Sequence, residues 1–388
     1  MNGRERILAA FHGRQPDFVP FAPNIYQWFF VNHRQGTLPV EVADAMHPFD
    51  VLRQLGADIL ARWDAQGLTR AVYSDGEFTE EWSGETEWNQ PMVTAFNTYP
   101  PRCTECRRTF RSPHGTLTNR WFFSDQAVAD FETDHWWTSW DQYEAIRFML
   151  EARDYVFDAD KFDILVEQVA DDGVFMVNLT EVPLKTLHWL AGAQNATYFL
   201  IDHPAEMQVL AQIQKEKVLD LLERIVDHPS AEIFITHDNL DTAFFPPYFY
   251  KTYCQDFFTE VAEIVHSRGK IFVSHACGRS RKLLPLVGQS RIDCLEGITP
   301  PPAGDVQLGE VREMVGYDNF TVNGGMDAAR QEIGQDAEEQ LHAYTSDLFE
   351  SMGDKRHFIY ASSCNTSPLT PWRNLMFLRD AARAYGQL

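Results

Sequence analysis

From about residue 173 to the C-terminus, short apolar runs alternate with longer amphipathic stretches. The apolar runs are rich in β-branched and aromatic residues, as buried strands are, and they read GVFMVNL, AEIFITH, KIFVSH, RIDCLEG, NFTVNGG and HFIYAS. Two of the stretches between them, residues 204–226 and 247–269, place their apolar residues at helical spacing. Strand–helix alternation of this kind predicts a parallel sheet covered by helices.

The number of these units is sufficient for a closed (β/α)8 TIM barrel, with a doubly wound open sheet as the second choice. The first part of the chain differs. Residues 1–17 predict a short amphipathic helix, and FVPFAP after it a strand. Between about residues 78 and 123, short runs rich in Thr, Trp and Phe are separated by turn residues, which predicts β-hairpins. We expect one barrel domain over residues 1–388, with the hairpins as an elaboration of its N-terminal half.

Composition and charge narrow the class of protein. The chain has 388 residues, of which 44% are hydrophobic and 13% aromatic, so it can bury a large core. Its formal net charge of −23 at pH 7 argues against nucleic acid, whose phosphates require clustered Lys and Arg. No apolar run approaches the ~20 residues of a membrane-spanning helix. Six cysteines in so long a chain do not form a disulfide framework, so we expect a reducing, cytoplasmic location. The acidic net charge suits an enzyme that docks a protein partner.

Polar side chains at the ends of the predicted strands are the first candidates for chemistry, because barrel active sites lie where strands end and βα loops begin. Seven such residues follow an apolar run: Glu181, Asp238, His275, Cys277, Glu296, Asp327 and Cys364.

His275 and Cys277 form an H-x-C pair directly after KIFVS. In extended backbone, residues i and i+2 share a face, so both side chains could reach one ion. Imidazole nitrogen and thiolate sulfur together suit zinc. The pair alone is weak evidence for a metal, and a buried cysteine beside a histidine that hydrogen-bonds nearby backbone is the more common explanation.

Cys364 strengthens the metal hypothesis, because it follows HFIYAS, the last expected barrel strand. In a parallel barrel it would lie on the same rim as His275 and Cys277. Three nitrogen and sulfur ligands leave one position of a tetrahedron open, as a catalytic zinc requires. The alternative is that Cys364 packs beneath the rim.

Several longer motifs carry a family resemblance. HACG is followed by RKLLPLV, then by CLEGITPPPAGDVQLGEVREMVG, NGGMDA and ASSC, while RERILAAFHGRQPDFVPF and LAGAQNATYFLIDHPAEMQVL extend the similarity over nearly the whole chain. These motifs resemble the uroporphyrinogen decarboxylase superfamily, and more closely its branch of methylcobalamin:coenzyme M methyltransferases and related corrinoid-dependent methyltransferases. The resemblance implies zinc (Zn²⁺) on an H-x-C…C motif, here His275, Cys277 and Cys364. It also implies transfer of a methyl group between a small methylated donor or a thiol acceptor and cobalamin.

The cobalamin is expected on a partner. The chain contains no D-x-H-x-x-G element of the kind that corrinoid-binding domains use. A separate corrinoid protein that docks over the barrel mouth is therefore the implied partner. We expect no nucleic acid or membrane partner, and a homodimer is the default oligomeric state.

Three acids are the catalytic candidates. The family resemblance implies a functional acid or substrate contact at Asp238, but the residue could equally cap a loop. Glu181 and Glu296 could be fourth ligands or proton carriers, or solvated loop acids. Asp327, after two glycines, is expected to have a structural or substrate-orienting role.

Two other functions stay open. One is a metal-free, decarboxylase-like lyase, and the other is a non-catalytic relative that binds a tetrapyrrole or corrinoid. The RQAGR-type element of uroporphyrinogen decarboxylase is absent, and FAPNIYQW stands in the corresponding region. Its multiply carboxylated substrate would also require a strongly basic pocket. Both points favour the methyltransferase.

The other motifs indicate less. Cys103 and Cys106 form a single C-x-x-C that we interpret as two ordinary thiols, and Cys254 and Cys294 as core residues. Aromatic residues concentrate in the first 140 positions. Core packing explains most of them, but some could wall a pocket for an aromatic methyl ether or a quaternary ammonium group.

Overall fold

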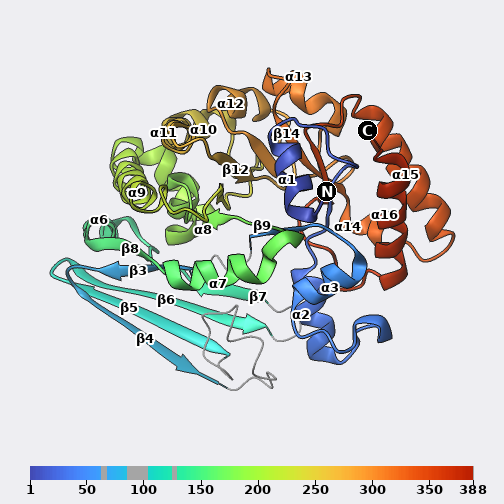
Figure 1. The fold of residues 1–388 in the computed structure, drawn as a ribbon. Coiled ribbons are helices and arrows are strands. Elements are labelled where there is room, and N and C mark those ends of the chain that lie inside the picture. Colours follow the sequence, from blue (N-terminus) through green and yellow to red (C-terminus); the bar gives the residue numbers. More distant parts are fainter. Residues whose placement is uncertain (63–67, 85–103, 125–128, 388) are drawn as a thin grey trace.

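A curled parallel sheet forms the centre of the computed structural model, which describes residues 1–62, 68–84, 104–124 and 129–387 (Figure 1). Its seven strands follow the order β1-β15-β14-β13-β12-β11-β10, and all neighbours are parallel. The strands are β1 (Phe21–Ala22), β10 (Val177–Asn178), β11 (Ile233–Thr236), β12 (Ile271–His275), β13 (Cys294–Ile298), β14 (Thr321–Met326) and β15 (Phe358–Ser362). Every residue of β11 to β15 is buried, which is why these strands are continuous apolar runs in the sequence.

A second parallel pair extends this sheet. It consists of β2 (Ile59–Ala61) and β9 (Gly173–Phe175). Next to β10, the Met176 amide donates to the Ala61 carbonyl at 2.7 Å, and next to β1 the Asp58 amide donates to the Phe21 carbonyl at 2.8 Å. Each end of the seven-stranded sheet thus has one hydrogen bond to this pair or to the residue before it. The predicted α/β fold with a parallel sheet is confirmed.

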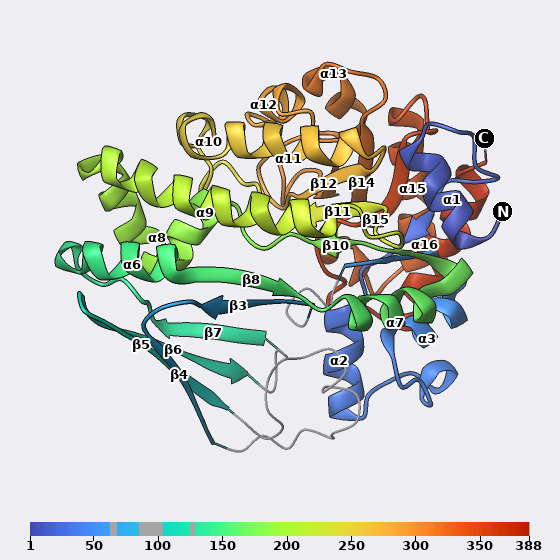
Figure 2. The same cartoon turned by 60° about the vertical axis from the view of Figure 1, so that its left-hand side comes forward.

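Helices surround the sheet on its outer side (Figures 1 and 2). Their bounds are α1 (Gly3–Phe11), α2 (Tyr26–Gln35), α3 (Pro48–Leu55), α6 (Tyr143–Ala152), α7 (Ala159–Val169), α8 (Pro183–Asp202), α9 (Pro204–Ile225), α10 (Pro247–Tyr253), α11 (Gln255–Ser267), α12 (Leu284–Gln289), α13 (Val311–Val315), α14 (Ala328–Gln331), α15 (Ala337–Ser351) and α16 (Trp372–Tyr385). The amphipathic stretch 204–226 becomes α9, whereas the stretch 247–269 forms two helices that meet at buried Cys254. None of the helices in the described ranges is long and apolar enough to cross a membrane.

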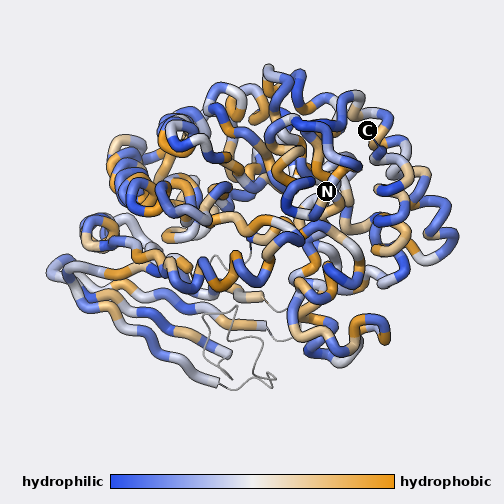
Figure 3. Tube along the Cα trace, in the orientation of Figure 1, coloured by the Kyte–Doolittle hydropathy of each residue, from blue (hydrophilic) through white to orange (hydrophobic). Residues whose placement is uncertain are grey.

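An antiparallel sheet lies to one side of the central sheet (Figures 1 and 2). Its strands, in order, are β4 (Glu77–Ser83), β5 (Glu105–Ser112), β6 (Gly115–Ser124) and β7 (Ala129–Asp134). Buried and exposed residues alternate along β6, and Figure 3 shows the matching alternation of hydrophobic and hydrophilic residues in this sheet. One face of the sheet is thus packed and the other is open to solvent. The pair of β3 (Thr69–Tyr73) and β8 (Arg153–Phe157), also antiparallel, joins the two regions.

Candidate metal centre

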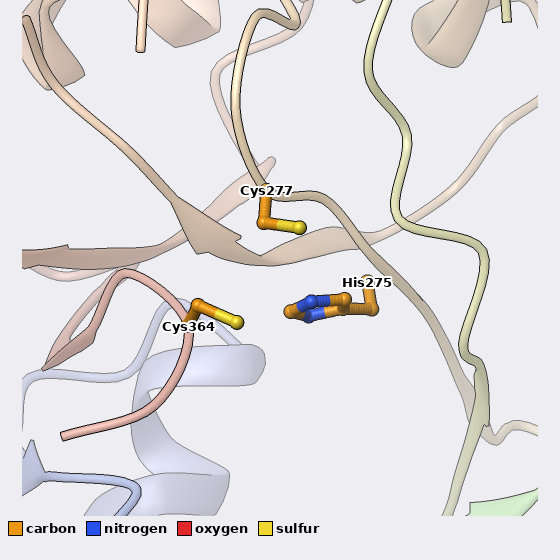
Figure 4. Close-up of side chains that lie close together, drawn as sticks. All are labelled: His275, Cys277 and Cys364. Carbon is orange, nitrogen blue, oxygen red and sulfur yellow. The ribbon is translucent and has the colours of Figure 1, made fainter. Parts of the chain in front are cut away.

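His275, Cys277 and Cys364 come together at the carboxyl ends of two central strands (Figure 4). His275 is the last residue of β12, Cys277 follows in the next loop, and Cys364 lies just beyond the end of β15. One ring nitrogen of His275 and the two Sγ atoms all lie within 4.8 Å of one another. Figure 4 shows both sulfur atoms and the imidazole pointing into the space between them. The three side chains could therefore hold one metal ion.

The electrostatics of the two thiols prepare one of them for metal binding. His275 is buried, and both cysteines are half-buried. The hydrogen bond from Cys277, aided by the nearby His275, lowers the pKa of the Cys364 thiol to about 4. The same hydrogen bond, together with burial, raises the pKa of Cys277. One thiolate is thus favoured even before a metal arrives, and the thiolate is the form that binds metal.

Glu296 and Arg62 fix the orientation of the His275 ring. Glu296 lies in β13 as the register partner of His275, and its Oε2 is hydrogen-bonded to His275 Nδ1. Arg62 Nη1 lies 3.1 Å from Glu296 Oε2 and 3.2 Å from His275 Nδ1. Burial would raise the pKa of Glu296, but the positive charges of Arg62 and His275 outweigh it, and the net effect is a lowered pKa. With Nδ1 occupied by a carboxylate, Nε2 remains for an ion.

Glu296 is only 4% exposed, so it is not a solvated loop acid. It contacts the candidate ligand His275 and lies outside the group of three possible ligands, and its role as a proton carrier stays a prediction. We describe it as a positioning residue. The sequence pattern could not distinguish a fourth ligand from a partner of the histidine, since both follow a strand.

Asp238 is buried near the centre but faces other partners. It accepts hydrogen bonds from the Ser274 hydroxyl at 3.0 Å and from the Val182 amide at 3.3 Å. Burial raises its pKa to about 6. These contacts tie the loop after β11 to β12 and to the start of α8, which supports the structural interpretation of Asp238.

The two other strand-end acids lie outside the cluster. Glu181 lines a pocket beside the antiparallel sheet. Asp327 is the N-cap of α14, where its side chain accepts a hydrogen bond from the Ala329 amide at 2.8 Å. This cap agrees with the structural role expected for Asp327.

Three residues near the centre did not stand out in the sequence: Arg62, Asn178 and His237. The His237 ring is buried with its centroid 6.0 Å from that of His275, and its Nδ1 lies 2.6 Å from Asn178 Nδ2. Burial and the nearby charge of Arg62 lower the pKa of His237. Each of the three follows or ends a short apolar run, as the recognised candidates do. Arg62 was missed because its strand, Ile59–Ala61, is too short to be read from the sequence.

The other cysteines in the described ranges do not join the cluster. Cys254 and Cys294 are fully buried, as expected for core residues. Cys106 is buried beside Trp121 and Phe123. Cys103 lies outside the described residues, so the interpretation of the C-x-x-C pair stays a prediction.

Residues 137–385 match the sequence model of the family described as Uroporphyrinogen decarboxylase (URO-D). The chain belongs to the uroporphyrinogen decarboxylase family. The matched segment contains all three side chains of the candidate metal centre, together with Glu296 and Asp238. All four strands of the antiparallel sheet precede it, as does Arg62. No curated protein matches the chain.

Among solved structures, a methyltransferase from Methanosarcina mazei covers 99% of this family member and 99% of its own chain, with 14% sequence identity and a TM-score of 0.59. At that identity the similarity establishes the fold alone. An intracellular xylanase from Thermoanaerobacterium saccharolyticum has a TM-score of 0.36 at 12% identity, over 56% of this chain and 74% of its own. A D-psicose 3-epimerase from Clostridium cellulolyticum has a TM-score of 0.31 at 10% identity, over 59% and 82%. The last two scores are too low to support an argument.

Proposed function

We propose that this protein is a zinc-dependent methyltransferase that moves a methyl group between a small methylated substrate or thiol and the cobalamin of a separate corrinoid protein. The observation that carries the proposal is the cluster of His275, Cys277 and Cys364. Two sulfurs and one imidazole nitrogen match the donors that zinc prefers, and three protein ligands leave a position for a substrate atom. Membership of the uroporphyrinogen decarboxylase family and the shared fold of the Methanosarcina mazei methyltransferase support it.

We also propose that the parallel strands close into a (β/α)8 barrel, in which β9 and β10, separated by Met176 alone, count as one strand. Residues 1–388 would form one unit, with the hairpin region of about 78–123 as its elaboration. The hydrogen bonds that link β2 to β1 and to the β9–β10 segment support closure. In a closed barrel the ends of β12 and β15 open on one mouth, where a substrate and a partner protein can meet. The metal centre stands at these strand ends.

The chain's own residues would hold, orient and shield the reacting group. When bound, zinc would supply Lewis-acid chemistry, either by deprotonating a thiol or by polarising the heteroatom that carries the methyl group. Glu296 would keep the His275 ring oriented through Nδ1. Arg62 would hold Glu296 ionised from a buried position. Asp238 would hold the carboxyl end of β12 in place by accepting a hydrogen bond from the Ser274 hydroxyl.

The proposal is tested by metal analysis and a methyl-transfer assay on the full chain. We expect about one zinc per chain and a change in the absorption spectrum of cob(I)alamin when a methyl donor is added. The donors to screen are methanol, methylamines, betaines, methyl thioethers and aromatic methyl ethers, and thiols serve as acceptors in the reverse direction. Absence of zinc together with absence of transfer in both directions would reject the proposal in favour of a metal-free lyase or a non-catalytic relative.

Replacing Glu296 with glutamine is expected to weaken zinc binding by about 10–100-fold, because the partner of a ligating histidine orients the ring and increases its basicity. The measurement is zinc retention during titration with a competing chelator. Glu313→Gln, at an exposed position of α13, is the matched control and should bind zinc as the unmodified protein does. Equal zinc affinity in the two variants would contradict the positioning role of Glu296.

A further inference from the structure

A pocket of about 530 Å³ lies between the antiparallel sheet and the loop that follows β10. We call it the aromatic pocket, because seven aromatic side chains line it: Tyr73, Phe78, Trp82, Trp121, Trp136, Tyr155 and Trp189. They come from β3, β4, β6, the segment before α6, β8 and α8. Aromatic rings that face a pocket rather than the core offer their negatively polarised faces to an occupant.

Several buried polar atoms around the aromatic pocket have no hydrogen-bond partner among the described residues. They include Thr69 Oγ1, Arg153 Nε, Asn178 Oδ1 and Thr186 Oγ1. Buried polar atoms in folded proteins are nearly always hydrogen-bonded. Their concentration around one pocket indicates that the occupant is polar as well as apolar.

Three charged side chains that line the aromatic pocket make no ion pair in the described part of the chain: Arg70, Arg153 and Glu181. Arg153 donates to the side-chain amide of Gln214 but makes no ion pair with a described carboxylate. The Glu181 carboxylate likewise makes no ion pair there, and only its backbone carbonyl accepts a hydrogen bond, from Gln214 at 3.2 Å. Glu80, by contrast, is paired with Arg108 at 2.7 Å. Arg70 is exposed to solvent, whereas Arg153 and Glu181 are half-buried, so the charges that a ligand would meet inside the pocket are those of Arg153 and Glu181.

We propose that the aromatic pocket binds a small zwitterion that carries a methylated ammonium group and a carboxylate. The ammonium group would lie against the aromatic faces with Glu181 beside it, since a desolvated cation is attracted by aromatic rings and by a carboxylate. The carboxylate would accept hydrogen bonds from Arg153. An aromatic ether would use the rings but leave both charges unpaired. The methylated nature of the ammonium group rests on the proposed function.

The aromatic pocket adjoins the metal centre. Asn178 is one of the residues that line the pocket. Its side-chain Nδ2 lies 2.6 Å from Nδ1 of His237, which does not line the pocket. The His237 ring in turn lies 6.0 Å from the ring of His275. An occupant of the pocket is thus separated from the proposed zinc ligand His275 by the side chains of Asn178 and His237.

The binding test compares three probes of similar size on the full chain. Glycine betaine carries both charges, 3,3-dimethylbutanoate keeps the shape and the carboxylate without the positive charge, and choline keeps the ammonium group without the carboxylate. Tryptophan fluorescence and calorimetry report binding, because tryptophans line the pocket. We expect betaine to bind at least about tenfold more tightly than either relative. Absence of saturable betaine binding, or equal affinity for all three probes, would overturn the inference.

Two substitutions test the role of each charged side chain in turn. Glu181→Gln should weaken betaine and choline by about tenfold and leave 3,3-dimethylbutanoate unchanged. Arg153→Gln should weaken betaine and 3,3-dimethylbutanoate and leave choline unchanged. The matched controls are Glu81→Gln and Arg111→Gln, two exposed positions of the antiparallel sheet that do not line the pocket. If both pocket variants bind every probe as the controls do, the assignment is wrong.

Betaine binding and methyl transfer are measured separately, so the pocket assignment and the methyltransferase proposal can fail independently. Betaine binding should persist after a chelator has removed metal, since none of the pocket residues belongs to the metal cluster. Betaine binding without any methyl transfer would reject the methyltransferase and retain the pocket assignment. Methyl transfer from methanol or a thioether without betaine binding would reject the pocket assignment and retain the methyltransferase.

Discussion

Cys364→Ala is expected to reduce bound zinc from about one ion per chain to a trace and to abolish methyl transfer. The substitution removes the sulfur whose thiol pKa is already lowered to about 4, and only His275 and Cys277 remain of the cluster. Two ligands rarely retain zinc against a chelator. Elemental analysis and the cobalamin assay measure the two effects on the same preparation.

Cys294→Ala is the matched control for that substitution. Cys294 is a fully buried thiol in β13 and lies outside the cluster. The Cys294→Ala variant should be somewhat less stable than the unmodified protein, because a small cavity forms. It should keep its zinc and its activity. Full zinc occupancy in Cys364→Ala would remove Cys364 from the proposed ligand set, whatever the activity.

Gly297→Ala should lower both the stability of the protein and its affinity for zinc. Gly297 follows Glu296 and has φ of +91°, which disfavours a side chain by about 1–2 kcal/mol. A Cβ there would also lie 2.8 Å from the carbonyl oxygens of Ala276 and Ser363 and 2.9 Å from Cε1 of His275. Ala276 lies between His275 and Cys277, and Ser363 directly precedes Cys364. Movement of these residues away from the new Cβ would therefore move the three proposed ligands apart. Thermal unfolding and chelator competition measure the two losses.

Gly316→Ala separates backbone strain from crowding. Gly316 has φ of +95°, close to that of Gly297, but a Cβ there meets nothing within 4 Å. We expect it to lower stability by a similar strain energy and to leave zinc affinity unchanged. If both alanine variants bind zinc equally well, the close approach at Gly297 does not shape the metal centre.

Part of the metal centre follows from local sequence. His275 and Cys277 are two residues apart at the end of a wholly buried strand, so extended backbone alone brings them to one side. Cys364 could be added because parallel strands in one sheet end on the same rim. These predictions needed only the strands and their common direction. The aromatic residues of the first 140 positions, by contrast, gave no sign of which of them would face one pocket.

The roles of Glu296 and Arg62 depended on strand order and register. Glu296 meets His275 because β13 pairs with β12 at that residue. Arg62 reaches both from the position directly after β2, a strand of three residues that pairs with β9, which lies more than 100 residues further along the chain. A pattern of apolar residues does not encode such pairings, because any parallel strand presents the same buried face.

The sequence by itself thus determined that the chain contains buried parallel strands alternating with helices, and that an imidazole and two thiols follow two of those strands. Burial requires apolar runs and amphipathic helices, and these are visible in the order of residues. Only the tertiary structure decided which side chains surround the ligands and that β3, β4, β6, β8 and α8 enclose a pocket. Such contacts join segments far apart in the chain, and they are set by the packing of whole elements rather than by local preference.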